Sequence, residues 1–392
     1  QTFYEVRSDM KKLILTPVLV LALALFAGCG EGGLFSSADN REKLAQPVCI
    51  LADDYLYWSP VENAVSYTVS VNGKEQPAQA LCGFDLDVNE ELSVKVRANA
   101  AEGSDTYKNS AYTAAILRSA DPSAYVRVTE SVLNEHASVQ NGKAYAVASL
   151  SGESSAYELD FSGYSGEPYL FRIPAEVRAV RVHGGDTVLH AGFCVLTRTD
   201  PLILELNGAN IQAPDDMCAV WCESMTALPG TADLIVRSVK NGDFENSLSG
   251  GDNSKDGETG KKGSGFPGEG GKGGKGNPGY AAISVPAVVF SGDLSLSVYG
   301  GNGSDGGRGG EAAWYGQGGD GGDGGDGADA VSAETLYLNM SGGQELRLIG
   351  GAGGSRGELG SGNNGLSTNH GKNGSSGTGY AGTPVVIRGM LG

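Results

Sequence analysis

Aspartates at every third position mark the stretch of this sequence with the clearest potential for chemistry. The run "GGDGGDGGDGADAV" at 318–331 places Asp320, Asp323, Asp326 and Asp329 among glycines, and Ca²⁺ prefers carboxylate oxygens. With three residues per turn and a rise of about 3.1 Å per residue, the carboxylates would line one edge about 9 Å apart. One such row cannot chelate an ion alone, so a solvated acidic edge remains the alternative to a calcium site.

The preceding glycine-rich stretch adds one more candidate calcium ligand. The sequence "GGNGSDGGR" at 300–308 matches the start of the calcium-binding nonapeptide Gly-Gly-x-Gly-x-Asp, with Asp305 as its aspartate. Gly307, however, stands where that motif packs an apolar side chain. Calcium is therefore the one cofactor for which the sequence offers candidate ligands, and no ligand set is complete.

Three aromatic residues are candidates for stacking on a ligand. Trp314 and Tyr315 follow one another amid glycines, where no core would bury them, and Trp221 ends the short motif "CAVW". Aromatic side chains offer large, rigid apolar surfaces, and ligand sites combine such surfaces with a few polar groups. These residues predict binding, with a polysaccharide or a host or cell-surface molecule as the partner.

The evidence for catalysis is weak. Asp215 and Asp216 could serve as the acid and base of glycoside cleavage, but a polar turn explains two adjacent aspartates better. Cys218 and Cys222 form a C-x3-C motif, and no second pair completes a zinc site. No Ser–His–Asp order with a Gly-x-Ser-x-Gly turn is present. We therefore predict no catalytic residue, and a polysaccharide lyase or hydrolase is kept as the less favoured alternative.

The other cysteines have structural interpretations. Cys194 precedes Cys218 by the same 24 residues that separate two repeats of an apolar motif, which predicts that the two cysteines stack in the core. In an exported protein they could oxidise. Cys49 and Cys82 are a further candidate pair whose geometry the sequence does not define.

A repeated motif predicts the element that must position these residues. Two apolar residues separated by one residue, then another residue and a glycine, recur from residue 179 onward, for example in "VRVHG" ending at Gly184 and "LELNG" ending at Gly208. A spacing of 24 residues with short period-2 strands suits one coil of a parallel β-helix. Later coils are longer, and the extra length lies in glycine-rich tracts at about 249–279, 300–327 and 350–379. These tracts are predicted to be insertions at equivalent corners.

The glycine tracts themselves are predicted to be ordered. Collagen needs a strict Gly-X-Y period, which slips at Gly265, and no phosphate-binding loop motif is present. Glycines on two of three edges allow backbones to approach and hydrogen-bond as polyglycine-II-like bundles. Lys272 and Lys275 share an edge in the first tract and would pair with two of the aspartates of 318–331.

A separate small domain precedes the repeats. Residues 46–118 show short alternating runs such as "YLYWSP" and "SYTVSVNG" between turn signals, a pattern typical of a β-sandwich. Trp58 is predicted to be its core indole. The stretch resembles a fibronectin type III domain, which implies a spacer and no function of its own.

The N-terminal residues predict export and anchoring. Lys11 and Lys12 precede an apolar run of about 14 residues, Leu13 to Phe26, and the segment closes at Cys29, as in a secretory signal. "FAGC" resembles the lipobox of bacterial lipoproteins, which makes Cys29 the predicted lipidation site, residues 1–29 the signal peptide and 30–45 a tether. The membrane would be reached through this lipid. A net charge of −18 argues against a nucleic-acid partner.

Two longer stretches carry a resemblance to a known group of proteins. "RTDPLILELNGANIQAP", followed by "CAVW", and "GDLSLSVYGGNG" resemble secreted bacterial parallel β-helix proteins over about 170–392. Some of that group bind acidic plant polysaccharide with calcium, which implies carbohydrate binding here. The glycine tracts alone resemble the glycine-rich bundles of phage tail-fibre adhesins and of one insect antifreeze protein, which implies ordered packing of the tracts. Asp215–Asp216 and His183–Gly184 resemble only fragments of the polygalacturonase pattern.

The sequence therefore predicts an all-β protein. A fibronectin type III-like sandwich would be followed, over 119–392, by a right-handed parallel β-helix with polyglycine-II-like corner loops. The predicted function is that of a non-catalytic, lipid-anchored cell-surface protein that acts in adhesion or carbohydrate binding. A structural surface element without a ligand is the alternative.

Overall fold

A computed structural model describes most of the chain beyond its N-terminal segment. The described residues are 40–136, 138–139, 145–185, 187–198, 200–223, 232–239, 245–265, 267–292, 294–340, 344–362 and 385–388. The chain divides into two units, Gln1–Arg41 and Glu42–Gly392. The predicted signal peptide, the lipidation site Cys29 and residues 30–39 of the tether lie outside the described residues. No helix within the described ranges is long and apolar enough to cross a bilayer.

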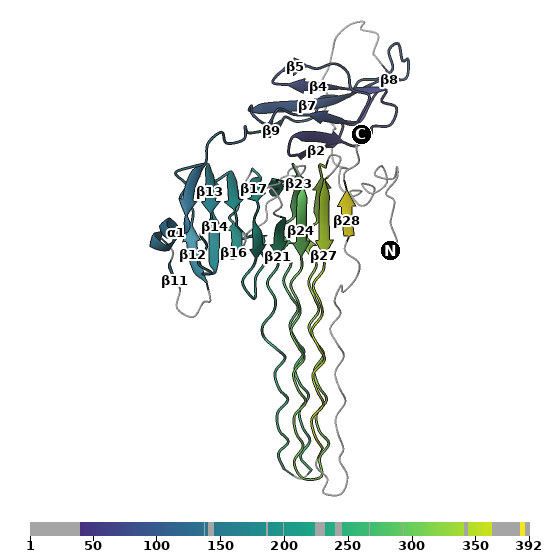
Figure 1. The fold of residues 1–392 in the computed structure, drawn as a ribbon. Coiled ribbons are helices and arrows are strands. Elements are labelled where there is room, and N and C mark those ends of the chain that lie inside the picture. The colour runs from purple at the N-terminus through teal and green to yellow at the C-terminus, as the bar shows by residue number, and fades with distance from the viewer. Residues whose placement is uncertain are drawn as a thin grey trace, which may run out of the picture. The chain divides into compact units, whose positions relative to one another are not determined.

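The protein is all-β, with long parallel sheets. Within the described residues the only helix is α1 (Glu130–His136). Residues 42–118, called here the antiparallel region, form antiparallel sheets except for the parallel pair β1–β8, and residues 126–388, called the parallel region, form mainly parallel sheets (Figure 1). Along each strand of either region, one side chain in two faces inward.

The antiparallel region contains three small sheets. A three-stranded sheet consists of β2 (Cys49–Ala52), β3 (Tyr55–Trp58) and β6 (Gly83–Asp85). A four-stranded sheet runs in the order β5 (Lys74–Glu75), β4 (Ser66–Val71), β7 (Leu92–Asn99) and β9 (Ile116–Arg118), and β1 (Glu42–Lys43) pairs with β8 (Tyr107–Lys108). Strand β7 alternates buried and half-buried or exposed residues along its whole length, so one of its faces packs on the core.

Trp58 lies in the core of the antiparallel region, as its sequence context predicts. Its side chain is 4% exposed and its ring centroid lies 5.4 Å from that of Tyr67. The indole N–H has no hydrogen-bond partner in the structure. The prediction of a core indole is confirmed.

The candidate disulfide between Cys49 and Cys82 does not form. Both residues are free thiols, and strand β3 lies between them: Cys49 pairs with Trp58, and the N–H of Trp58 donates to the carbonyl of Cys82. Strands two apart in a sheet are separated by about 9.6 Å, beyond the Cα–Cα reach of about 7 Å for a disulfide. Burial raises the pKa of Cys49 to about 12, so this thiol stays protonated and inert.

The parallel region is built from ladders of short strands. A seven-stranded parallel sheet runs in the order β10 (Val126–Thr129), β13 (Ala156–Asp160), β15 (Ala179–His183), β17 (Leu202–Asn207), β20 (Leu234–Val239), β23 (Ala287–Ser291) and β26 (Thr335–Leu338). A twelve-stranded sheet, parallel except at its two ends, runs in the order β11 (Ser138–Val139), β12 (Ala146–Ser149), β14 (Tyr169–Ile173), β16 (Val188–Val195), β18 (Asn210–Gln212), β21 (Asn246–Ser249), β24 (Ser295–Tyr299), β27 (Glu345–Ile349) and β28 (Val385–Arg388). Strands β19 (Val220–Cys222), β22 (Ile283–Ser284) and β25 (Val331–Ser332) branch from β16.

The period of 24 residues is confirmed in the seven-stranded sheet. Residue 179 pairs with residue 203, 24 positions later, and every later pair between β15 and β17 keeps this offset. Inward-facing residues of successive strands form one continuous core, which includes Leu159, Val182 and Leu206, all fully buried. The repeat therefore predicts the ladder, because each strand of the sheet must present an apolar side chain at the same place.

The predicted stacking of Cys194 on Cys218 is wrong. Cys194 pairs with Trp221, 27 positions later. At the other end of β16, Val188 pairs with Asn210, 22 positions later. Five extra residues therefore lie in the turn between β18 and β19. They shift the register of β19, so that Cys218 falls before the strand begins.

A row of alternating charges crosses the outer face of the seven-stranded sheet. The register aligns Arg127, Glu158, Arg181, Glu205 and Arg237 on five successive strands, followed by Ser291 on the sixth. Arg127 and Arg181 lie 3.9 and 3.6 Å from Glu158, and Arg181 also pairs with Glu205. Opposite charges placed directly across a sheet stabilise it.

The antiparallel region supplies the next carboxylate in this row. Asp53, in the turn between β2 and β3, is 3% exposed. Its carboxylate accepts hydrogen bonds from both Nε and Nη2 of Arg237 and from the hydroxyl of Ser291. Arg237 also donates to Asp121 at 2.7 Å, and Arg118 lies 3.6 Å from Asp53. The cluster stands beside an apolar row in which Ala52 packs with residues of the parallel sheet.

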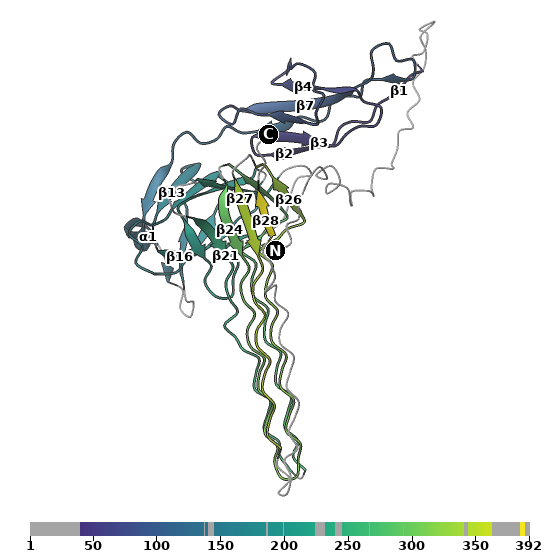
Figure 2. The ribbon, with the colours of Figure 1, turned by 45° about the vertical axis from the view of Figure 1, so that its right-hand side comes forward.

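The glycine tracts leave and re-enter the parallel region at one position. Strands β21, β24 and β27 stack in register, and each is followed directly by a glycine tract. The first two tracts return to β22 and β25, which also pair with each other. Figure 1 and Figure 2 show the tracts running side by side away from β21, β24 and β27. Within the described residues the tracts are thus inserted at equivalent positions of successive paired strands.

Candidate functional site

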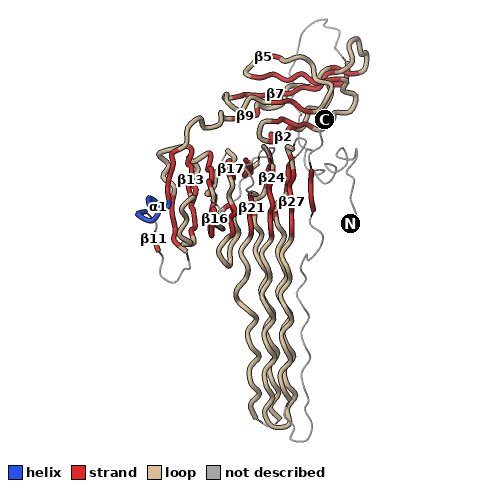
Figure 3. Tube along the Cα trace, in the orientation of Figure 1, coloured by secondary structure: helices blue, strands red, loops and turns tan. Residues whose placement is uncertain are grey.

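The glycine tracts form a bundle of extended legs. Within the described residues there are five: leg 1 (251–263), leg 2 (268–280), leg 3 (301–313), leg 4 (316–328) and leg 5 (351–362), together called the glycine bundle. They form neither helix nor strand (Figure 3). Odd-numbered legs lead away from the sheets and even-numbered legs return, so neighbouring legs of one tract run in opposite directions.

Backbone hydrogen bonds join the legs at every third residue. The N–H groups of Gly257 and Gly260 in leg 1 donate to carbonyls of leg 3 at 2.8 Å, and those of Gly273 and Gly276 in leg 2 donate to leg 4 at 2.8 Å. Further bonds join legs that run in opposite directions, such as Gly322 N–H to the carbonyl of Gly307 at 2.7 Å. The tracts are thus ordered because their backbone donors find partners in neighbouring legs.

The spacing between legs leaves no room for side chains on their inner sides. A Cβ atom at Gly322 would lie 1.8 Å from the carbonyl oxygen of Gly274, and one at Gly307 would lie 2.1 Å from that of Glu258. Leg 1 has at most one glycine in each triplet, and its exposed Glu258 and Lys261 stand where leg 3 has glycines. Glycine therefore occurs on the sides of a leg that another leg covers.

Side-chain oxygens also hold neighbouring legs in register. The carboxylate of Asp256 accepts the N–H of Asp305 at 3.1 Å, and the carboxylate of Asp305 accepts the N–H of Ser355 at 2.7 Å. Asp252 and Asn302 repeat this arrangement nearer the sheets, with bonds of 2.7 and 2.8 Å to the next leg. Asp305, a candidate calcium ligand, thus has a structural role.

Three of the other candidate calcium ligands lie along leg 4, and the fourth, Asp329, comes directly after it. Asp320, Asp323 and Asp326 are half-buried and Asp329 is exposed. Lys275 of leg 2 lies 3.3 Å from Asp326, so the predicted pairing of a lysine of the first tract with an aspartate of the second is confirmed for this pair. In the described part of the chain no three His, Cys, Asp or Glu side chains come together as a metal site would require.

The aromatic candidates differ in their surroundings. Trp221 is half-buried and packs against the outer face of β16, since a Cβ atom at Gly192 would lie 3.0 Å from its ring. Trp314 and Tyr315 form the turn between legs 3 and 4 and are 69% and 55% exposed. The bundle therefore presents these two rings to solvent at its far end, while Trp221 is largely occupied by packing.

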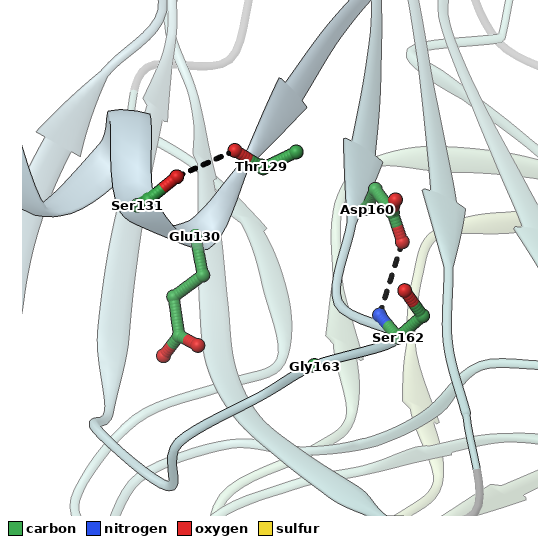
Figure 4. Close-up of a pocket in the computed structure, with 6 residues that line it drawn as sticks. All are labelled: Thr129, Glu130, Ser131, Asp160, Ser162 and Gly163. Carbon is green, nitrogen blue, oxygen red and sulfur yellow. Dashed lines mark hydrogen bonds between the residues drawn. The ribbon is translucent and has the colours of Figure 1, made fainter.

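A polar pocket lies near the start of the parallel region. It has a volume of about 400 Å³ and is lined by Thr129, Glu130, Ser131, Asp160, Ser162 and Gly163 (Figure 4). Glu130 accepts hydrogen bonds from the N–H and hydroxyl of Ser165 at 2.9 and 2.6 Å. None of these six described lining residues is aromatic.

Asp160, one of the two carboxylates that line this pocket, is held in its ionised form. Burial alone would raise the pKa of Asp160, but hydrogen bonds from Arg127 and from the N–H of Ser162 outweigh burial and lower that pKa to about 2. Asp160 is therefore ionised at neutral pH and cannot donate a proton. A glycosidase needs one carboxyl group with a raised pKa as its acid, and Asp160 does not provide it.

The remaining chemical candidates lie in structural positions. Asp215 and Asp216 are exposed in the turn between β18 and β19, with Asp216 at a φ of 64°, which agrees with a polar turn. Cys218 and Cys222 are free thiols, and burial raises the pKa of both. Protonated, half-buried thiols of this kind are poor nucleophiles and poor metal ligands.

Two features had no counterpart in the predictions. Asp53 and Arg237 are 184 residues apart and no local pattern links them. Leg 1 has at most one glycine per triplet, whereas most triplets of leg 2 have two. This difference was visible in the sequence, and it marks leg 1 as an edge of the bundle.

Comparisons with known proteins find no relative: no family model, no curated protein and no solved structure matches this chain. The features that bear on function are therefore the hydrogen-bonded legs of the glycine bundle and the turn at its far end.

Proposed function

We propose that this protein is an exported, lipid-anchored binding protein without catalytic activity, whose glycine bundle binds a carbohydrate or another surface ligand in adhesion. One observation carries the proposal: an ordered, hydrogen-bonded bundle ends in a turn whose two aromatic side chains are 69% and 55% exposed. Exposed aromatic residues on a rigid support are typical of binding sites.

The architecture that we propose for this function follows the sequence prediction. The parallel region would be a right-handed parallel β-helix, an interpretation supported by strands that stack in register with a 24-residue offset. The legs would be polyglycine-II-like, as three residues per repeat of hydrogen bonding suggest. The antiparallel region would be a fibronectin type III-like spacer between the anchor and the β-helix.

Removal of the bundle tests the proposed function. A variant in which residues 253–278, 302–326 and 352–378 are each replaced by a four-residue turn is expected to lose binding to cells or glycans at least tenfold. The measurement is adhesion of coated beads and binding to a printed array of neutral and acidic oligosaccharides. Circular dichroism controls for intact sheets. Undiminished binding by a folded variant would show that the bundle is not the binding element, and a wild-type protein that binds nothing would favour a purely structural surface element.

The proposed anchor has its own test. Cys29→Ser is expected to abolish incorporation of radiolabelled palmitate and to release the protein from the membrane fraction or leave it unprocessed. The physical reason is that each buried methylene contributes about 0.8 kcal/mol to membrane binding, and the serine variant would carry no acyl chain. A Cys49→Ser variant is the matched control and should label normally. Unchanged labelling of Cys29→Ser would contradict lipidation at this residue.

A further inference from the structure

The turn between legs 3 and 4 has an unusual residue at its critical position. The N–H of Gly316 donates to the carbonyl of Ala313 at 2.9 Å, which closes a four-residue turn. Tyr315 is its third residue and has a φ of 60°. A positive φ at this place is the arrangement of a type II turn, where glycine or asparagine is the ordinary choice.

Tyrosine is an unfavourable choice for this conformation. A bulky residue with positive φ is a genuine outlier, and such strain clusters at sites where it serves a function. The chain contains 63 glycines, and in the neighbouring turn between legs 1 and 2 it places Gly265 at a φ of 94°. Glycine would therefore satisfy the turn at lower cost, so the aromatic ring at this position is kept at the expense of the turn's stability.

The turn is held firmly on the neighbouring leg. The N–H of Ala313 donates to the carbonyl of Gly268 at 2.8 Å, and a Cβ atom at Gly316 would lie only 1.9 Å from the same oxygen. Both ends of the turn thus pack against leg 2. The two rings are presented from a preorganised backbone, which reduces the entropy that binding must overcome.

The size of the exposed surface limits the kind of ligand. An aromatic side chain buries about 150–250 Å², so Trp314 and Tyr315 offer at most about 500 Å². A stable protein interface needs about 800 Å² per partner. The neighbouring positions are polar: Glu311, which lies 3.6 Å from Lys262, and Gln317 are exposed on either side of the turn. Two flat rings flanked by hydrogen-bonding groups suit a ring that has one apolar face and many hydroxyl groups.

We infer that the turn Ala313–Gly316 is a glycan-binding tip, in which Trp314 and Tyr315 stack on the faces of sugar rings. The inference rests on the proposed function and gives it a ligand class and two contact residues. Tyr315 has two opposite effects that can be measured: it lowers the stability of the turn, and it raises the affinity for the glycan. A residue kept only for folding would not separate these two properties.

The experiment compares full-length variants on a printed array of neutral and acidic oligosaccharides, followed by titration of the strongest ligand. Trp314→Ala and Tyr315→Gly are each expected to weaken binding at least tenfold. Tyr315→Phe keeps the ring and should stay within threefold of the wild type. Tyr299→Ala is the matched control, because Tyr299 is 37% exposed at the other end of the tract and should not affect binding.

Stability supplies the second readout. Tyr315→Gly is expected to melt at the same temperature as the wild-type protein or higher, and to slow amide exchange at residues 313–316. Loss of both stability and binding in this variant would overturn the inference that the tyrosine serves the ligand.

The outcomes separate the inference from the proposed function. Glycan binding that requires the bundle but survives both Trp314→Ala and Tyr315→Gly overturns the tip and leaves the function standing. A wild-type protein that binds no oligosaccharide overturns the glycan class. Binding to a purified surface protein that is lost in Trp314→Ala would also overturn the glycan class, while it supports adhesion through the bundle.

Discussion

Gly322→Ala is expected to reduce amide protection in legs 2 and 4 roughly a hundredfold. The added Cβ atom would lie 1.8 Å from the carbonyl oxygen of Gly274, a distance that forces the two legs apart by more than 1 Å. At least three hydrogen bonds near this point, including those of Gly273 and Gly276, would weaken or break. At about 1 kcal/mol for each bond, the local free energy of opening falls by about 3 kcal/mol. Hydrogen exchange followed by mass spectrometry measures this change.

The neighbouring residue provides the control for this substitution. Asp323 already carries a Cβ atom, so Asp323→Ala introduces no new contact and removes only a half-buried charge. Exchange in legs 2 and 4 should stay within about threefold of the wild-type rate, because partly exposed ion pairs contribute about 1 kcal/mol or less. Equal exchange in the wild type and in Gly322→Ala would contradict the close packing of the legs.

Asp53→Asn is expected to lower the free energy of unfolding by about 3 kcal/mol. This value is at the lower end of the range of about 3–5 kcal/mol that is seen when one partner of a buried ion pair is removed. The amide cannot neutralise Arg237, which would keep only Asp121 as a charged partner. Asparagine tolerates the positive φ of 59° at this position, so backbone strain does not confuse the result. Urea denaturation at pH 7 measures the difference, with Asp54→Asn at the adjacent exposed residue as the control.

The same pair predicts a pH dependence. Burial alone would raise the pKa of Asp53, but the hydrogen bonds and positive charge of Arg237 and the hydroxyl of Ser291 hold it below its ordinary value. A group with a lowered pKa stabilises the folded state above its unfolded pKa of about 4, and this contribution is lost as the pH falls through the lowered pKa. The stability gap between wild type and Asp53→Asn should therefore narrow below pH 4. A constant gap would show that the charge of Asp53 does not act in this way.

The parallel ladders could be predicted because their physical cause repeats along the chain. Each strand of the seven-stranded sheet must bury apolar residues at the same place, and this requirement produces the spacing between Gly184 and Gly208. The glycine tracts could be predicted for a similar reason, since every covered side of a leg excludes a side chain. Periodic causes leave periodic patterns in a sequence.

The features that the sequence did not predict have causes that act only once. The five extra residues before β19 moved Trp221, and not Cys218, opposite Cys194, because turn length has no periodic signal. Asp53 is a single aspartate in a turn, and its role depends on Arg237, 184 residues away. The positive φ of Tyr315 likewise depends on how the turn closes on leg 2.

The hydrogen bonds of the glycine bundle run crosswise to its legs, which determines how the bundle responds to tension. A pull on the turn at Trp314 would load legs 3 and 4 along their length. The bonds that join these two legs to legs 1, 2 and 5 would then be sheared together, and none would be peeled open before the others. The resisting force adds up over the whole length of the legs. A long bundle of weak backbone bonds can thus transmit a pull from its tip to the parallel sheets without coming apart.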